Sequence, residues 1–574
     1  MSKFLRVNMK DQSTHVEDPP SKYRLMGGRR LTAQLVSDEV PPTCEPLGRD
    51  NKLILAPGLL GGTAAPCSGR LSIGGKSPLT GGIKESNSGG MFGQKLARLG
   101  YKAVIIEEQP ENGWYVLKID GRGVSLLNAD HLLGLDNYDA CESLRKEHGD
   151  KVGLVVIGEA GERQYLTATC AIADIDGIPA RQAARGGMGA VMGNKGIKAI
   201  VLDDSGAVEF EFTDKKLYRE TCQKWRKELI EKKKVLTEYG TANLVMTTAN
   251  IGCLVTRNYS YGDFDKKESI SGERLAETIK ERGGDPSHNC MRGCPIRCSN
   301  VYYDANGNHL TSSLEFETIA LMGSNLEIGD LDVIAKIDRF CDGYGIDTMD
   351  LGAAIGVAME AGLLKFGDGE AVLGLIDEIK NESMLGKVLA QGVAVTGRVL
   401  GARRTPAVKG QGLAGYDPRS LKGTGVTYAT SPMGADHTAG NCLPGRKGYR
   451  PETQQDRDTG VAEGQVELSK DLQALHTVCD AAGLCFFVGA DAVTADYVKT
   501  LLNARYGEKL TVEDILQIGK DTILTELEFN SKAGITSAQN DLPAFFREEK
   551  LPPRDTRFDI DPSELVQFYE DWRK

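Results

Sequence analysis

Four cysteines have the residue type and spacing that hold an iron–sulfur cluster. Cys290, Cys294 and Cys298 lie within nine residues, and Cys485 ends the distant stretch Asp-Ala-Ala-Gly-Leu-Cys. Clusters are held by thiolates in such arrangements, because four thiolates supply the charge and softness that iron needs. Zinc can use the same ligands. The pattern therefore predicts a metal site made by two distant parts of the chain.

Three other interpretations of the triplet are weaker. A structural zinc site is usually built from two Cys-x2–4-Cys pairs, and the sequence shows no second pair near this one. Radical-generating cluster motifs space their thiols x3 then x2, whereas here both gaps are x3. Chance clustering on a helix face is disfavoured because Gly293 and Pro295 oppose a regular helix. An iron–sulfur cluster, and with it a redox function, is the preferred interpretation.

A carboxylate and an imidazole are candidates for proton transfer. Glu315 and Glu317 lie in Ser-Leu-Glu-Phe-Glu-Thr, close after the triplet, and His437 lies in Met-Gly-Ala-Asp-His-Thr-Ala-Gly. A lone Glu is usually a solvated charge and a lone His is usually structural. In low-charge segments near a suspected cofactor, however, the two groups could exchange protons with a substrate near neutral pH.

Two glycine-rich segments place bare backbone amides beside a cation. Gly69–Ser77 contains Arg70 and does not match a P-loop, and Gly187–Gly193 follows Arg185 and misses the dinucleotide fingerprint by one residue. Loop geometry alone could explain both glycine patterns. The combination also suits an anionic ligand of many atoms.

One short pattern occurs twice. Asp342–Asp347 and Asp480–Cys485 both fit Asp-x-x-Gly-(Ile/Leu)-(Asp/Cys), and each follows a predicted helix. The glycine is expected to end that helix in the left-handed conformation. Two ordinary helix ends would explain either copy alone. Two copies, one of them carrying the distal cysteine, indicate equivalent loops that face one two-fold-like ligand.

The strands and helices that must position these residues, as predicted from the sequence, indicate an α+β fold. Short apolar runs at 53–55, 103–106, 155–157 and 199–202 alternate with glycine-rich turns, which is typical of strands. Helical spacing begins later, at 215–239, 331–341, 351–364, 468–479 and 495–504. We expect a sheet-rich domain at 1–205 and two mainly helical domains at 206–412 and 413–574.

Composition excludes several classes of protein. A chain of 574 residues exceeds one hydrophobic core, and its net charge of −11 argues against a nucleic-acid partner. No run of about 18 apolar residues occurs, so no membrane span is expected. The N-terminus has no signal-peptide pattern, and the 13 scattered cysteines are typical of reduced thiols and metal ligands. We expect a cytoplasmic protein.

These segments, taken in order, resemble the tungsten-containing aldehyde:ferredoxin oxidoreductase family over nearly the whole chain. The matching segments are 76–80 with 86–90, 184–193, the cysteine triplet, 315–318, the first Asp-x-x-Gly loop, 416–419, 428–431 and the second loop. The resemblance implies a tungsten or molybdenum bis-pterin centre without a protein ligand on the metal. It also implies that the sheet-rich domain binds the pterins and that the two helical domains clasp them.

The resemblance implies specific residue roles. Cys290, Cys294, Cys298 and Cys485 would hold a [4Fe–4S] cluster, and Glu317 with His437 would handle substrate protons. The residues that match positions facing the pterins are Arg70, Asn87, Gly89, Arg185, Gly186, Gly189, Asp342, Ile346, Asp347, Gly434, Asp436, Asp480 and Leu484. The implied reaction oxidises an aldehyde to a carboxylic acid and passes electrons to ferredoxin or a similar iron–sulfur carrier.

Two departures from the family's pattern leave alternative functions open. The well-known aldehyde enzymes space their triplet x2 then x3, so this chain is expected to belong to a divergent branch. The helix after Glu317 lacks the Glu-x-x-His pair that would bind an iron between subunits, so a homodimer held by that metal is not supported. The alternatives are a reductase of an acid, thioester or other carbonyl substrate with the same cofactors, and, more remotely, a cluster-only electron-transfer subunit.

Overall fold

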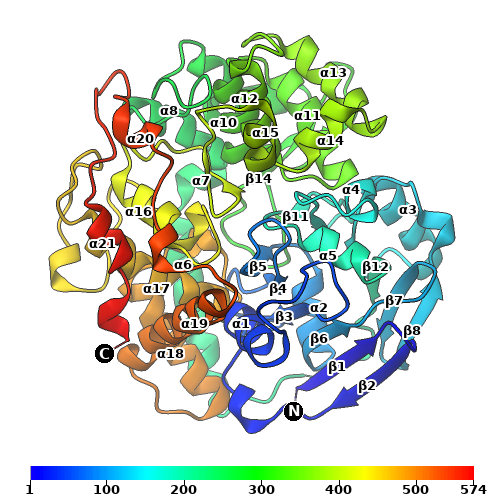
Figure 1. Cartoon of the computed structure of the whole chain (residues 1–574). Helices are drawn as coiled ribbons and strands as arrows, with labels where there is room; N and C mark the ends of the chain where they lie inside the picture. Colours follow the sequence, from blue (N-terminus) through cyan, green and yellow to red (C-terminus); the bar gives the residue numbers. More distant parts are fainter. Residues whose placement is uncertain (1, 208, 574) are drawn as a thin grey trace.

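The structure is a computed structural model that describes residues 2–207 and 209–573. Its N-terminal part holds two six-stranded sheets, which lie at the lower right of Figure 1 in blue and cyan. The first sheet has the order β2-β1-β6-β3-β4-β5, with bounds β1 Lys3–Asn8, β2 Ser13–Glu17, β3 Leu53–Pro57, β4 Leu71–Lys76, β5 Ile83–Ser88 and β6 Tyr101–Glu107. The second has the order β8-β7-β12-β9-β10-β11, with bounds β7 Tyr115–Asp120, β8 Gly123–Asn128, β9 Gly153–Val156, β10 Cys170–Ile172, β11 Arg181–Ala183 and β12 Ile197–Leu202.

The two sheets repeat one topology. In the first, β1 pairs parallel with β6 and every other neighbouring pair is antiparallel. In the second, β7 pairs parallel with β12 and the other pairs are again antiparallel. Helices occupy matching places in the chain: α1 (Gly28–Glu39) and α2 (Phe92–Arg98) in the first unit, α3 (Asn137–His148) and α5 (Met188–Asn194) in the second. The N-terminal part is therefore a structural duplication.

Burial on both faces explains why the central strands are continuous apolar runs. The inner faces of the two sheets share one core, to which Leu55 and Ile73 belong from the first sheet and Ile157 and Ile200 from the second unit. The outer face of the first sheet packs against α1, and the outer face of the second packs against α3. The predicted strands at 53–55, 103–106, 155–157 and 199–202 correspond to β3, β6, β9 and β12.

The rest of the chain is mainly helical and forms two further cores. The helices are α6 Lys215–Lys232, α7 Lys234–Tyr239, α8 Leu244–Asn250, α9 Gly272–Glu281, α10 Phe316–Met322, α11 Leu331–Tyr344, α12 Thr348–Glu360, α13 Gly369–Lys380, α14 Met384–Ala390, α15 Val393–Leu400, α16 Lys422–Thr430, α17 Gln465–Ala482, α18 Ala492–Tyr506, α19 Val512–Lys532, α20 Phe545–Glu548 and α21 Pro562–Val566. Small sheets are formed by β13 Asp285–His288, β14 Ser299–Tyr303 and β15 His309–Thr311, and by β16 Ala407–Val408 with β17 Gln411–Gly412. The α+β fold class predicted from the sequence is confirmed.

Each of the two helical cores contains residues from both of the expected helical domains, 206–412 and 413–574. Trp225 of α6 stacks on Tyr497 of α18, with ring centroids 4.9 Å apart. Phe545 and Leu565, near the C-terminus, belong instead to the core of α10–α16. The predicted helix at 215–239 is two helices, α6 and α7, separated at Lys233. The domain boundaries at 205 and 412 stay predictions.

Two helix ends dock on the two sheets in the same way. Helix α11 ends at Gly345 and α17 ends at Gly483, both in the left-handed conformation with φ of 81° and 79°. A Cβ added at Gly345 would lie 3.0 Å from the backbone nitrogen of Gly158, and one added at Gly483 would lie 2.9 Å from the Cα of Gly58. Gly58 and Gly158 follow the equivalent strands β3 and β9. The repeated Asp-x-x-Gly pattern is therefore also a repeat in space.

Over residues 2–207 and 209–573, no helix is long and apolar enough to cross a bilayer.

Because the contact at Gly58 involves backbone alone, we expect Gly58→Ala to destabilise the fold. Its new Cβ would meet the backbone of Gly483 at 2.0 Å, so one segment must shift, at a cost of about 1–3 kcal/mol in the free energy of unfolding. Gly374 lies in α13, and a Cβ added there would meet no atom of the described residues within 4 Å, so Gly374→Ala is the control and is expected to stabilise by about 0.5–1 kcal/mol. Chemical denaturation of both variants measures the difference, and equal stabilities would contradict the interpretation.

Candidate active site

A cavity lies where the two sheets meet the helical part. Its walls come from β5, from β11 with the turn after it, and from α12, α17 and the segment 433–439. The edge strands β5 and β11 contact each other, so the cavity sits at the junction of the duplicated units. Of the residues predicted from the sequence, this cavity brings together Arg70, Asn87, Arg185, Asp436, His437 and Asp480.

Four cations in the cavity wall suit an anionic ligand. They are Arg29, Arg70, Lys84 and Arg185, and the same wall holds the carboxyl groups of Glu85, Asp436 and Asp480. Lys84 is fully buried, and burial lowers the pKa of its ammonium. Its Nζ lies 3.3 Å from Oδ2 of Asp436. Burial opposes ionisation of Asp436, but the cations of Lys84 and Arg185 keep the pKa of that carboxyl below its ordinary value.

Arg185 connects the sheets to both flanking segments of the helical part. The turn after β11 places it, and its Nη1 donates to the carbonyl of Ala435 at 2.7 Å. Its Nε and Nη2 lie 3.4 and 3.5 Å from the carboxylates of Asp347 and Asp350. Burial raises the pKa of Asp347 to about 6, although the Arg185 cation acts in the opposite direction. Arg185 therefore fixes the segment before His437 relative to the first loop.

The side chains of Glu317 and His437 face each other beside the cavity. Glu317 lies in the first turn of α10, and its Oε2 accepts a hydrogen bond from the Gly415 amide at 2.7 Å. The other oxygen, Oε1, lies 3.2 Å from Nε2 of His437. Both side chains are largely buried, with exposed fractions of 15% and 12%. Among the described residues, Nδ1 of His437 has no hydrogen-bond partner, so that nitrogen is available to a ligand.

The two Asp-x-x-Gly loops carry similar electrostatics. Burial raises the pKa of Asp342 to about 7, and burial together with the Glu85 carboxylate raises that of Asp480 to about 7. A buried arginine acts against the shift in each case: Arg181 beside Asp342 and Arg29 beside Asp480. Both carboxyl groups are thus poised between the charged and neutral forms near neutral pH.

The four predicted cysteine ligands gather at one place behind the second loop. Cys294, Cys298 and Cys485 belong to one hydrophobic cluster, and the partly buried Cys290 packs against it. Burial, with the neighbouring thiol of Cys294, raises the pKa of Cys290 to about 12. The structure therefore joins the triplet of the β13–β14 loop to the cysteine that follows α17.

The remaining predicted residues lie around the cavity rather than in its wall. Ile346 and Leu484 are buried, each directly after the glycine that ends its helix. A Cβ at Gly89 would meet the sulfur of Cys290 at 3.3 Å, whereas at Gly186 and Gly189 it would meet Lys84 and the Thr169 backbone. Gly434 has a φ of 85° and packs against Gln411. These glycines permit close packing of the segments that surround the cavity.

Several wall residues were missed by the sequence analysis: Arg29, Lys84, Glu85, Gln182, Met349, Met433 and Phe486. One signal pointed to the β5 and β11 regions. Gly-Gly-Met occurs at 89–91, directly after β5, and again at 186–188, where two residues separate it from β11. Recognising this repeat would have predicted the duplication, and with it the matching roles of β5 and β11.

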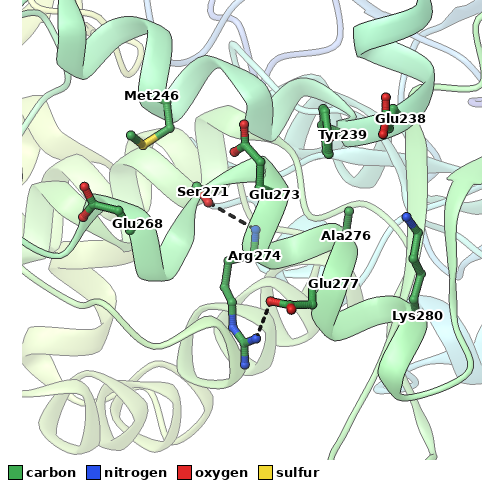
Figure 2. A pocket seen from close by; sticks show the side chains of 10 residues that line it. All are labelled: Glu238, Tyr239, Met246, Glu268, Ser271, Glu273, Arg274, Ala276, Glu277 and Lys280. Carbon is green, nitrogen blue, oxygen red and sulfur yellow. Dashed lines mark hydrogen bonds and ion pairs between the residues drawn. The ribbon is translucent and has the colours of Figure 1, made fainter.

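A second hollow, of about 690 Å³, lies between α7, α8 and α9 (Figure 2). Its charged groups include Glu238, Glu273 and Lys280, and Arg274 pairs with Glu277 at 2.7 Å. Ser271 serves as the N-cap of α9, and its hydroxyl accepts from the Arg274 amide. Because its polar groups stabilise α9, and none of the predicted site residues line it, this hollow is not the candidate site.

Comparison with known proteins identifies the fold and the family. The family model described as "Aldehyde ferredoxin oxidoreductase, N-terminal domain" matches residues 4–204, and the model for domains 2 and 3 matches residues 220–570. A tungsten-containing aldehyde ferredoxin oxidoreductase of Pyrococcus furiosus is 34% identical, over 96% of this chain and 92% of its own length. The WOR-like subunit of an aliphatic sulfonate oxidoreductase from the same organism is 27% identical, over 76% and 74%.

A solved structure agrees with the fold. The active-site complex BamBC of benzoyl coenzyme A reductase, in complex with 1,5-dienoyl-CoA, superposes with a TM-score of 0.83. The match covers 100% of this chain and 94% of that one at 19% identity, so it speaks for the fold. The family matches and the full-length relative confirm the resemblance seen in the sequence: the chain belongs to the aldehyde ferredoxin oxidoreductase family.

Proposed function

We propose that the protein is a tungsten or molybdenum bis-pterin oxidoreductase that oxidises an aldehyde to a carboxylic acid. Electrons would leave through a [4Fe–4S] cluster to ferredoxin or a similar iron–sulfur carrier. The observation that carries this proposal is the approach of Glu317 to His437, 3.2 Å apart, at a cavity whose wall holds four basic side chains and near which the four thiols lie. Family membership supports the cofactors.

The residues present fit a bis-pterin group. Arg29, Lys84 and Arg185 are paired with carboxylates, and Arg70 lies in the same wall, so the wall would offer donors to phosphate and other anionic atoms, and Asn87 with Gln182 would offer neutral hydrogen bonds. The two equivalent loops, each with an aspartic acid of pKa about 7, suit the two near-equivalent halves of such a ligand. The duplication of the sheets supports this assignment.

The thiols fit a cluster better than a single ion. Within residues 2–207 and 209–573, no three Cys, His, Asp or Glu side chains are grouped closely enough to hold one metal ion. Cys290, Cys294, Cys298 and Cys485 nevertheless share one mostly apolar environment, as a cluster of iron and sulfide wider than one ion requires. These four residues would be its ligands.

The proposed role of the chain in catalysis is to position the substrate and move protons. The bound metal–pterin group supplies the two-electron oxidation, which no side chain can perform. An aldehyde and one water give the acid, two protons and two electrons, and the bound metal–pterin group would accept the electrons. In this proposal Oε1 of Glu317 would take a proton from that water, and Nε2 of His437, 3.2 Å away, would share it. The Gly415 amide keeps the carboxylate oriented.

Replacement of either member of the proton-handling pair should lower turnover strongly and leave the cofactors in place. We expect Glu317→Gln and His437→Gln each to lower aldehyde-dependent dye reduction about 10²–10⁴-fold, the usual contribution of a positioned acid or base. Metal and iron contents should equal those of the unsubstituted enzyme. Glu273→Gln, the same chemical change at an exposed position of α9, is the control and should keep full activity. Activity that survives both substitutions would contradict the assigned roles.

The natively purified protein should contain about four irons and one tungsten or molybdenum per chain, measured by elemental analysis. Iron without a heavy metal, in a preparation shown to have kept its cofactors, would favour the cluster-only subunit. Zinc as the sole metal would contradict the redox function altogether. If both metals are present, assays with aldehydes, carboxylic acids and thioesters in both directions distinguish the aldehyde oxidase from a reductase of another substrate.

A further inference from the structure

A fifth thiol lies among the four proposed cluster ligands. The Sγ of Cys67 is 3.7 Å from the Sγ of Cys294, within the range of a sulfur hydrogen bond. Cys67 is only 2% exposed and belongs to the hydrophobic cluster that contains Cys294, Cys298 and Cys485. It comes from the loop between β3 and β4, far from all four in the sequence.

The backbone holds Cys67 in a fixed position relative to the cluster ligands. Its carbonyl accepts a hydrogen bond from the amide of Cys485 at 2.9 Å. Three residues later, the Arg70 amide donates to the carbonyl of Gly483 at 3.2 Å. The loop carrying Cys67 is thus tied at two points to the loop carrying a proposed ligand.

The local conformation of Cys67 is also unusual. Its φ is 56°, in the left-handed region that residues other than glycine rarely adopt. The Ser68 hydroxyl stabilises the turn by donating to the Ala65 carbonyl at 2.9 Å. The chain therefore adopts a costly backbone conformation at the residue whose thiol meets Cys294.

Two simpler interpretations of Cys67 exist. It could fill space as a small apolar residue, as most buried cysteines do. It could also be a ligand in place of Cys294, because the two sulfurs are neighbours. The first leaves the contact between the sulfurs without a role. The second interpretation would leave Cys294 without iron, although Cys294 lies in the triplet that supplies two of the other proposed ligands.

We propose that Cys67 is a positioning residue whose S–H group donates a hydrogen bond to the sulfur of Cys294 in the cluster-bound enzyme. A thiolate bound to iron can only accept, so Cys67 must be the donor. The bond withdraws negative charge from the coordinated sulfur and favours the reduced, more negative cluster. Cys67 therefore raises the reduction potential of the cluster. This inference rests on the cluster of the proposed function.

The test compares the reduction potentials of full-length enzyme variants, followed by electron paramagnetic resonance during a redox titration. In Cys67→Ala, the ratio of reduced to oxidised cluster at a fixed potential should fall about three- to tenfold, the value of one modest hydrogen bond. Tenfold corresponds to about 59 mV for a one-electron couple. Cys67→Ser keeps a donor and the same backbone strain, so its potential should stay near that of the unsubstituted enzyme.

The control is Cys222→Ala, at a buried cysteine of α6 in the same hydrophobic cluster, and its potential should not change. An unchanged potential in Cys67→Ala, with four irons retained, would overturn this inference alone. Loss of iron in Cys67→Ala but not in Cys294→Ala would also overturn it, because Cys67 would then be the ligand. An unsubstituted enzyme without a cluster would overturn the proposed function as well.

Discussion

Two contacts between backbones join the helical part of the molecule to its sheets. Gly483 lies against Gly58 and Gly345 lies against Gly158, with no room for a side chain at either contact. Main-chain hydrogen bonds add to both: the amides of Leu59 and Leu60 donate to the carbonyls of Ala481 and Ala482, and the Thr169 amide donates to the carbonyl of Gly345. Because both loops begin at these contacts, the places of the two aspartic acids, of Cys485 and of the cavity follow from them.

Charge pairing reinforces the same interface. Arg29 of α1 binds Glu526 of α19 through two hydrogen bonds of 2.8 Å, and both side chains are almost completely buried. Lys84 and Arg185, likewise on the sheet side, reach Asp436 and Asp347 on the helical side. Buried ion pairs add little net stability, because desolvation offsets the attraction. They do penalise any other arrangement of the two parts, so they specify the geometry of the cavity.

Phe486 links the thiol group to the proton-handling pair. It directly follows Cys485 in the chain and lines the cavity. Its ring stacks on His476 with centroids 4.6 Å apart, and its centroid lies 6.2 Å from that of His437. The second loop thus carries a proposed cluster ligand on one side and a cavity wall on the other. This arrangement suits the proposed function, in which electrons leave the site of proton transfer through the cluster.

Local patterns in the sequence determined much of this protein. Helix ends at Gly345 and Gly483, the apolar strands and a site made by four cysteines from two distant parts of the chain were predicted because each depends on neighbouring residues or on ligand chemistry. The tertiary structure alone decided that Arg29 meets Glu526, 497 positions away, and that Cys67 meets Cys294, 227 positions away. Such pairings depend on how duplicated sheets and helix ends dock, and no periodicity in the chain records that geometry.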